Sequence, residues 1–252
     1  MPGSSPRTDR SAARSLLRAW VARVALPGGS DWLDERAAMV AEAAGDRDLF
    51  LAFSLAPRKV GKQDLGLSPE DLEEADRART GWRPGHWSVD QAARCLLLLS
   101  RPVEEAKTFT SALDRMIRAA DVGEAVAFYQ SLPLLPHPEA LAPRAAEGLR
   151  TNMTSVFEAV ALRNPYPAEY LDEPAWNQMV LKALFVGSSV DATQGLDARA
   201  NPRLASMLLD FVRERRAAGR PVDPTLWRCL GEFGGEEAVE LRSVEHADPR
   251  LP

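Results

Sequence analysis

Polar side chains inside an apolar helical stretch are the first residues of this sequence that could do chemistry. Between Pro174 and Val186, Asn177 falls among leucines at helical spacing, and Lys182 occupies a narrow wedge of an otherwise apolar wheel. A buried amide without partners costs about 1–3 kcal/mol, so Asn177 requires a hydrogen bond. Lys182 requires water, a carboxylate or an anionic ligand. The two residues predict a polar site within a helical core.

The preceding helical stretch repeats this pattern. Apolar residues recur at helical spacing from Ala145 to Val160, and Asn152 falls on their stripe. Asn164 then precedes a proline, which pushes a residue out of the helical region, so the chain must turn there. We expect the two stretches to be neighbours in an antiparallel hairpin, with Asn152 and Asn177 turned inward.

A third polar residue in an apolar helix is Arg94. It projects between two leucines of the helix predicted after Ser88, and Asp90 lies one turn before it. The two side chains can form an ion pair at this spacing. In a buried helix the pair needs further hydrogen bonds, because both ions lose their hydration. Two interpretations remain: an arginine that contacts a ligand, or a partly solvated ion pair at a helix start.

Three cations follow the helix that is predicted over Arg47–Ala56 and broken by a proline. Arg58, Lys59 and Lys62 surround a glycine there. Closely spaced cations on a flexible backbone can hold a phosphate or a carboxylate. The alternative is a solvated turn whose cations favour the negative end of the helix before it. The segment is not a P-loop, because the first glycine and the hydroxyl residue of that motif are missing.

Tryptophans gather in the segment GWRPGHWSVDQ, which glycine and proline interrupt. Trp82, His86 and Trp87 could form the wall of a ligand pocket. Aromatic residues also dominate core burial, so the tryptophans could instead fill the seam between two helical layers. Both interpretations place this segment between helices.

The elements that must position these residues are all predicted to be helices. Most have recognisable starts, such as Ser68 before Pro69 and either Asp172 or Glu173 before Pro174, and no window alternates with the period of a strand. The expected fold is all-α: layered antiparallel helix pairs in an α-solenoid or HEAT-like array, without clear sequence repeats. We expect a disordered lead over 1–10, one helical domain over 11–247 and a tail over 248–252. Residues 187–201 are predicted to form a long polar loop.

Composition excludes several classes of protein. The 252 residues carry a net charge of -5, with a pI near 5.4, which argues against nucleic acid as the main partner. Cys95 and Cys229 stand far apart, as expected of core residues in a reducing compartment. No apolar run approaches the roughly 18 residues of a membrane span, and no secretion signal is recognisable, so we expect a cytoplasmic protein. No catalytic or metal-binding motif occurs, and we expect neither metal nor cofactor.

Several stretches between Phe50 and Leu230 resemble the EboA family of bacterial ebo gene clusters. They are FSLAPRKVGKQDL, GHWSVDQAAR, ADVGEAVAFYQSLPLLPHPE, RAAEGLRTNM, NPYPAEYLDEPAWNQMVLKALFVG, GLDARANPRLA and TLWR. The resemblance implies a cytoplasmic helical protein of metabolite traffic. It implies partners among other ebo-cluster proteins, including a prenyltransferase-like membrane protein. It transfers no catalytic residue.

The leading hypothesis is an accessory protein of secondary-metabolite traffic that binds a small metabolite precursor or docks pathway partners. One alternative is an enzyme acting on a prenylated or phosphorylated intermediate, with Lys182 or a buried carboxylate as acid or base. Another is a pure helical scaffold. The candidate ligand-binding residues are Arg58, Lys59, Lys62, Trp82, Trp87, Arg94, Arg150, Asn152, Asn164, Asn177 and Lys182.

Overall fold

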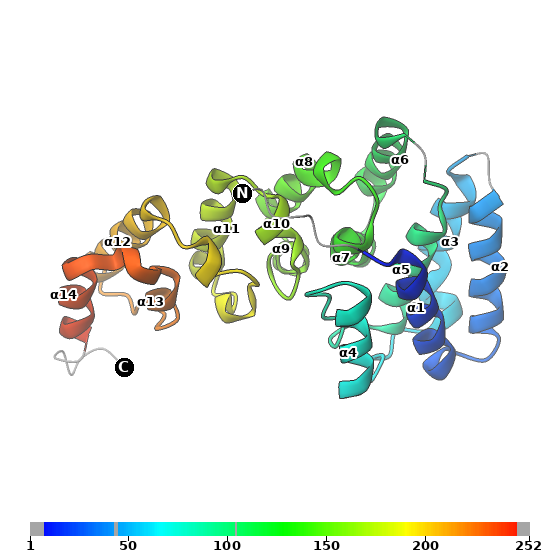
Figure 1. The fold of residues 1–252 in the computed structure, drawn as a ribbon, viewed down its shortest axis with the longest axis horizontal. Coiled ribbons are helices and arrows are strands. Elements are labelled where there is room, and N and C mark those ends of the chain that lie inside the picture. The colour runs from blue at the N-terminus through cyan, green and yellow to red at the C-terminus, as the bar shows by residue number, and fades with distance from the viewer. Residues whose placement is uncertain (1–7, 43–44, 104, 246–252) are drawn as a thin grey trace. The chain divides into compact units, whose positions relative to one another are not determined.

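Helices joined by short turns make up the computed structural model, which describes residues 8–42, 45–103 and 105–245 (Figure 1). The chain divides into two compact units, Met1–Tyr170 and Leu171–Pro252. The first unit holds α1 (Arg10–Val24), α2 (Gly29–Glu42), α3 (Arg47–Val60), α4 (Pro69–Ala78), α5 (Val89–Ser100), α6 (Ala106–Ala119), α7 (Val122–Ser131), η1 (Leu132–Leu134), α8 (Pro138–Arg150), α9 (Thr154–Ala161) and α10 (Tyr166–Tyr170).

The second unit is helical as well. It holds α11 (Glu173–Val186), η2 (Val190–Ala192), η3 (Asp197–Arg199), α12 (Pro202–Ala217), α13 (Leu226–Cys229), η4 (Gly231–Gly234) and α14 (Gly235–Glu245). Within the described ranges there is no β-strand, and one isolated bridge pairs Asp64 with Ser88. The all-α prediction is therefore confirmed.

The division into two units lies inside the single domain that we predicted over 11–247. One domain over 11–247 stays a prediction, because a division by internal contacts does not decide whether either unit folds alone. Of the expected disordered lead, residues 1–7 lie outside the described part, as does the tail over 248–252. Residues 8–10 do not belong to a disordered lead. The side chain of Asp9 caps α1 by accepting from the Ala12 amide at 2.9 Å, and the Asp9 amide donates to the Ala78 carbonyl.

Helix α5 lies at the centre of the first unit and contacts α1, α2, α3 and α7 (Figure 1). Every residue from Ala92 to Ser100 is buried, as expected of a helix that is apolar on nearly all sides. Its start was recognisable in the sequence, because the Gln91 side chain accepts from the Ser88 amide at 2.9 Å, as in a capping box. Helix α5 thereby fixes Arg94 inside the core.

The prediction that Pro57 ends α3 is wrong. The helix continues through this proline to Val60. A proline inside a helix leaves the carbonyl four residues earlier without its hydrogen bond. That carbonyl belongs to Phe53, and it accepts from Arg94 Nε at 3.0 Å. A side chain of α5 thus supplies the donor that Pro57 lacks.

The prediction of a single helix over 145–160 is also wrong. Helix α8 ends at Arg150 and α9 begins at Thr154. Between them the Thr151 backbone is extended, with ψ 151°, and the Met153 amide donates to the Thr151 hydroxyl at 3.2 Å. A hydroxyl side chain that bonds its own backbone competes with the helical ladder in this way. Asn152 therefore lies exposed in a turn and not on a core-facing stripe.

Residues 187–201 are not the plain polar loop that we predicted. Two 3₁₀ turns, η2 and η3, form there, because Val190 and Leu196 are buried and anchor the segment. The helix before it matches the prediction closely. Asp172 caps α11 by accepting from the Ala175 amide at 2.8 Å, and Gly187 ends it with φ 76°.

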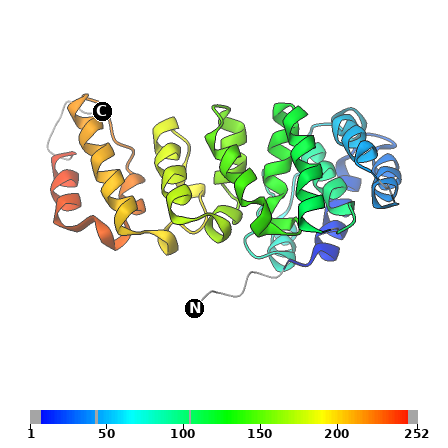
Figure 2. The ribbon, with the colours of Figure 1, turned by 90° about the horizontal axis from the view of Figure 1, so that it is seen from above.

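The second unit closes on its last helices. Figure 2 shows α12 (orange) beside α14 (red). Arg213 of α12 forms ion pairs with Asp210 in its own helix and with Glu237 in α14. At such exposed positions each pair contributes at most about 1 kcal/mol, so these pairs add little to the stability of the unit.

Candidate functional site

The segment after α4 positions the tryptophans that the sequence singled out. Ser68 and Asp71 form a capping box that starts α4, with the Ser68 amide donating to Asp71 at 2.9 Å. At its other end, Arg79 turns the backbone out of the helix, and Asp76 accepts from the Gly81 amide at 2.8 Å. This turn directs Trp82 back toward the core.

Three indole rings meet there. Trp82 and Trp87 are 2% and 3% exposed. The Trp82 ring lies 5.3 Å from that of Trp20 and 6.0 Å from that of Trp87, between centroids. Trp20 donates to Asp71 at 3.0 Å, whereas Trp82 Nε1 is buried with no hydrogen-bond partner among the described residues. The rings are packed in the core, as the interpretation of a filled seam between helical layers requires. The indole N–H of Trp82 nevertheless has no acceptor among the described residues.

A cavity of about 920 Å³, here called the Trp82 pocket, opens over this segment. Its volume lies within the roughly 300–1,000 Å³ that small-molecule sites span. It is lined by Pro69, Leu72, Glu73, Asp76, Arg77, Trp82, Arg83, Gly85, His86 and Arg163. Helix α4, the tryptophan segment and the turn after α9 therefore each contribute one wall.

Only some of the arginines that line the Trp82 pocket have an ion-pair partner among the described residues. Arg77 lies 3.8 Å from Glu73 and 3.9 Å from Glu74, so its charge is balanced on its own helix. The guanidinium groups of Arg83 and Arg163, by contrast, have no hydrogen bond or ion pair to any described residue. Arg163 also adopts a left-handed backbone conformation, with φ 52°, which is uncommon for a residue with a long side chain. Two exposed cations without an ion-pair partner among the described residues thus share the lining with Trp82, and Asp76 is the carboxylate there that has no ion pair.

His86 adds a neutral polar group to the same wall. Its Nε2 lies 3.3 Å from Gln130 Nε2. Desolvation of the ring, and then the positive charge of Arg163, lower the pKa of His86 to about 4. The imidazole is therefore uncharged at neutral pH. It leaves Arg83 and Arg163 as the cations that an anion would meet.

A second, much smaller cavity of about 10 Å³ lies behind the first and shares Trp82, Arg83, His86 and Arg163 with it. Its remaining wall includes Trp87, Gln130 and Asn164. Gln130 Oε1, like Trp82 Nε1, is buried without a partner among the described residues. This volume is about that of one water molecule. Of the predicted ligand-binding residues, the structure brings together Trp82, Trp87 and Asn164 at this cavity.

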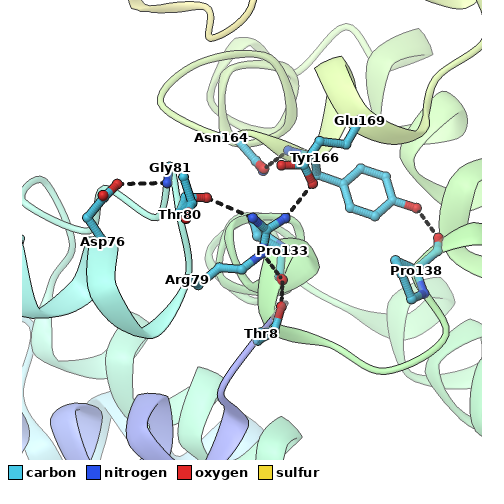
Figure 3. Close-up of polar contacts among 10 residues, drawn as sticks. All are labelled: Thr8, Asp76, Arg79, Thr80, Gly81, Pro133, Pro138, Asn164, Tyr166 and Glu169. Atoms are coloured by element: carbon cyan, nitrogen blue, oxygen red, sulfur yellow. Dashed lines mark hydrogen bonds and ion pairs between the residues drawn. The ribbon is translucent and has the colours of Figure 1, made fainter. Parts of the chain in front are cut away.

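A buried ion that the sequence analysis did not identify, Arg79, contacts Pro133 of the small cavity's lining (Figure 3). Arg79 is 1% exposed and pairs with Glu169 of α10. Its Nε donates to the Pro133 carbonyl at 3.1 Å, and its Nη1 donates to the Thr80 carbonyl at 2.7 Å. Burial raises the pKa of Glu169, and Arg79 opposes that rise. No local pattern marks Arg79, because its decisive partners lie far along the chain.

Asn164 holds the turn that carries Arg163 (Figure 3). Its amide donates to the carbonyls of Tyr129 and Ala159, at 3.1 and 3.0 Å, and its Oδ1 accepts from the Tyr166 amide at 3.0 Å. With these three bonds the Asn164 amide is fully engaged with main chain. Its side chain therefore positions Arg163 and shapes the small cavity, and the ligand-contacting role remains a prediction.

The other predicted site residues lie elsewhere in their units. Arg94 pairs with Asp90 at 2.6 Å, so the predicted ion pair is confirmed, and desolvation lowers its pKa. Arg58, Lys59 and Lys62 are exposed at the end of α3. Arg150 is exposed at a cavity of about 370 Å³ by α8 and α9. None of these five residues lines the Trp82 pocket.

In the second unit, Asn177 is 1% exposed and hydrogen-bonded, as its burial required. It exchanges two hydrogen bonds with Asn201, at 3.1 and 2.9 Å, and Asn201 caps α12. Lys182 is half-buried, and desolvation lowers its pKa. The Asn177 amide thus joins α11 to the start of α12.

Comparison with known proteins identifies the family of the chain. A family model described as metabolite traffic protein EboA matches residues 13–231. The chain belongs to the EboA family. Searches of curated proteins and of solved structures found no match.

The EboA match includes the Trp82 pocket, its small neighbouring cavity and the Arg79 ion pair. It therefore confirms the resemblance that the sequence stretches indicated. Within the described ranges, no helix is both long and apolar enough to cross a bilayer. The sequence singled out Trp82 and His86 but passed over Arg83, although a cation between two tryptophans in a glycine- and proline-broken segment was a signal available for it.

Proposed function

We propose that this EboA-family chain holds a small anionic metabolite with an apolar body in the Trp82 pocket, as an accessory protein of metabolite traffic. The observation that carries the proposal is the pair of cations, Arg83 and Arg163, whose guanidinium groups have no partners among the described residues beside a buried tryptophan. The proposal includes a cytoplasmic setting, a solenoid-like layering of helix pairs and the ebo-cluster partners that the resemblance implies.

The chemistry of the lining supports an anion with an apolar body. A guanidinium donates two parallel hydrogen bonds to a carboxylate or phosphate. Trp82, Leu72 and Pro69 offer apolar surface on which the rest of such a molecule can pack. The neutral state of His86 adds a hydrogen-bonding group without adding charge. The described lining residues include no nucleophile paired with a base, so binding is favoured over catalysis.

A fluorescent anion with flat rings, 1-anilinonaphthalene-8-sulfonate, tests the site directly. Titration of the full chain should show saturable one-to-one binding. The double variant Arg83→Ala/Arg163→Ala should weaken it about tenfold or more, because each charge-assisted hydrogen bond contributes about 1.5–3 kcal/mol. The matched control is Arg47→Ala/Arg220→Ala, which removes the same charge from outside the pocket.

Equal affinities of the two double variants would show that the dye binds elsewhere and would contradict the proposal.

A second measurement detects the natural ligand and does not require its identity beforehand. Native mass spectrometry of the chain purified from its own cells should detect a small molecule that is retained by the control variant and lost from Arg83→Ala/Arg163→Ala. Retention by both variants would count against the Trp82 pocket.

A further inference from the structure

Three arginines of α1 line a second cavity that shares no residue with the Trp82 pocket. Arg10, Arg14 and Arg18 follow one another at four-residue spacing, so they lie on one face of the helix. Together with Arg101 they surround a volume of about 510 Å³, here called the arginine trough. Its other lining residues are Ser11, Ser15, Ala41, Leu98, Leu99, Ser100, Pro102, Val103 and Pro136.

The charges of the trough are only half balanced. Arg18 pairs with Asp34, and Arg101 pairs with Asp46; both carboxylates lie outside the lining. The guanidinium groups of Arg10 and Arg14 have no hydrogen bond or ion pair to any described residue. None of the described residues that line the trough is acidic. Two positive charges therefore lie one helical turn apart without an ion-pair partner among the described residues.

Helix polarity does not remove this imbalance. Arg10 is the first residue of α1, where the free amides carry about half a positive elementary charge, and the Asp9 carboxylate before it is engaged with the Ala12 amide. The end of α5, which lines the trough with Leu98 to Ser100, offers the opposite partial charge. That end supplies roughly -0.5 elementary charge, which is too little for two full cations.

We infer that the arginine trough binds a phosphate monoester with an apolar body. Arg10 and Arg14 are about 6 Å apart along the helix axis at 1.5 Å per residue. A phosphate monoester, with a charge of about -1.5 to -2 and three acceptor oxygens, can engage both guanidinium groups at once. A single carboxylate has half that charge. The hydroxyls of Ser11 and Ser15 add donors, and Leu98, Leu99, Pro102 and Val103 give apolar surface for the rest of the molecule.

Phenyl phosphate titrated calorimetrically into the full chain tests this inference. The variant Arg10→Ala/Arg14→Ala should bind it about tenfold more weakly than the unmodified chain. Arg47→Ala/Arg220→Ala, whose residues line neither cavity, makes the same charge change, serves as the control and should stay within about twofold of the unmodified chain. Arg83→Ala/Arg163→Ala, in the Trp82 pocket, is measured beside it to show which cavity holds the phosphate. Phenol should not bind, because it lacks the charge.

The outcomes separate this inference from the proposed function. Loss of binding in the Arg83→Ala/Arg163→Ala variant alone would assign the phosphate to the Trp82 pocket and overturn the inference. Equal binding by all variants, or no binding by the unmodified chain to phosphate in any form, would overturn it as well. If Arg10→Ala/Arg14→Ala does not fold, Arg10→Gln/Arg14→Gln removes the same charges and keeps most of the length of the side chains.

The phosphate can belong to a free metabolite or to a lipid headgroup. Sedimentation with phosphatidylcholine vesicles containing phosphatidic acid distinguishes these sources. Vesicle binding that is lost in Arg10→Ala/Arg14→Ala, without calorimetric binding of phenyl phosphate, would support the lipid source. Binding of phenyl phosphate with no sedimentation would support the soluble one. Both results retain the phosphate chemistry of the trough.

Discussion

Buried arginines of this chain and arginines that line the Trp82 pocket differ in the partners of their guanidinium groups. Arg79 has a carboxylate partner and two carbonyl acceptors, and Arg94 has a carboxylate partner and one. The guanidinium groups of Arg83 and Arg163, at the Trp82 pocket, have no such partner among the described residues. A buried cation must satisfy its donors inside the fold, whereas a cation at a pocket can keep them for a ligand. The comparison separates residues that stabilise the chain from residues that can bind.

The largest expected effect comes from Arg79. Arg79→Met should lower the free energy of unfolding by about 3 kcal/mol, because it leaves Glu169 half-buried without its partner. Arg83→Met should change it by about 0.5 kcal/mol or less. Urea denaturation of both variants measures the difference. If both variants lose equal stability, the distinction between the two kinds of arginine fails.

The second prediction concerns Arg94 and Pro57. Arg94→Met should destabilise the chain by about 3 kcal/mol in the natural background. In a Pro57→Ala background the cost should be about 1 kcal/mol smaller, because the backbone amide restored at position 57 can then donate to the Phe53 carbonyl. A double-mutant cycle by urea denaturation measures this coupling. The same cost in both backgrounds would show that Arg94 does not replace the missing amide.

The smallest expected effect is the pH dependence caused by His86. Its pKa is lowered to about 4 in the folded chain, whereas an unfolded histidine titrates near about 6.5. The unfolded chain therefore takes up a proton first, and stability falls as the pH drops from about 6.5 toward 4. His86→Asn should reduce this fall. Denaturation at pH 7, 6 and 5 measures it, and an identical pH profile of the variant would argue against this assignment.

Local patterns predicted local structure well. The starts of α4, α5 and α11 and the ion pair of Asp90 with Arg94 depend on residues three or four positions apart, so capping and spacing rules predicted them. Asn177 was placed correctly in the core, because its helix is apolar all round. The family followed from longer stretches of matching sequence.

Features that depend on distant partners escaped prediction. Helix α3 continues through Pro57, and Arg94 of α5 donates to the Phe53 carbonyl that the proline leaves without an amide. The sequence of α3 alone does not reveal this donor. Asn152 had the right spacing for a core position, but a local hydroxyl bond ends the helix just before it. Arg163 reaches the Trp82 pocket through a turn whose left-handed conformation no residue type announced.

Arg79 also says something about the order in which the first unit can assemble. Its acceptors at Pro133 and Glu169 lie 54 and 90 positions away along the chain. Contacts of such long sequence separation form only after the intervening segments have closed. We therefore expect the ion pair to form late in folding. A truncated chain that stops before α10 would strand a cation in the core, so α10 sets the shortest length at which the first unit can be complete.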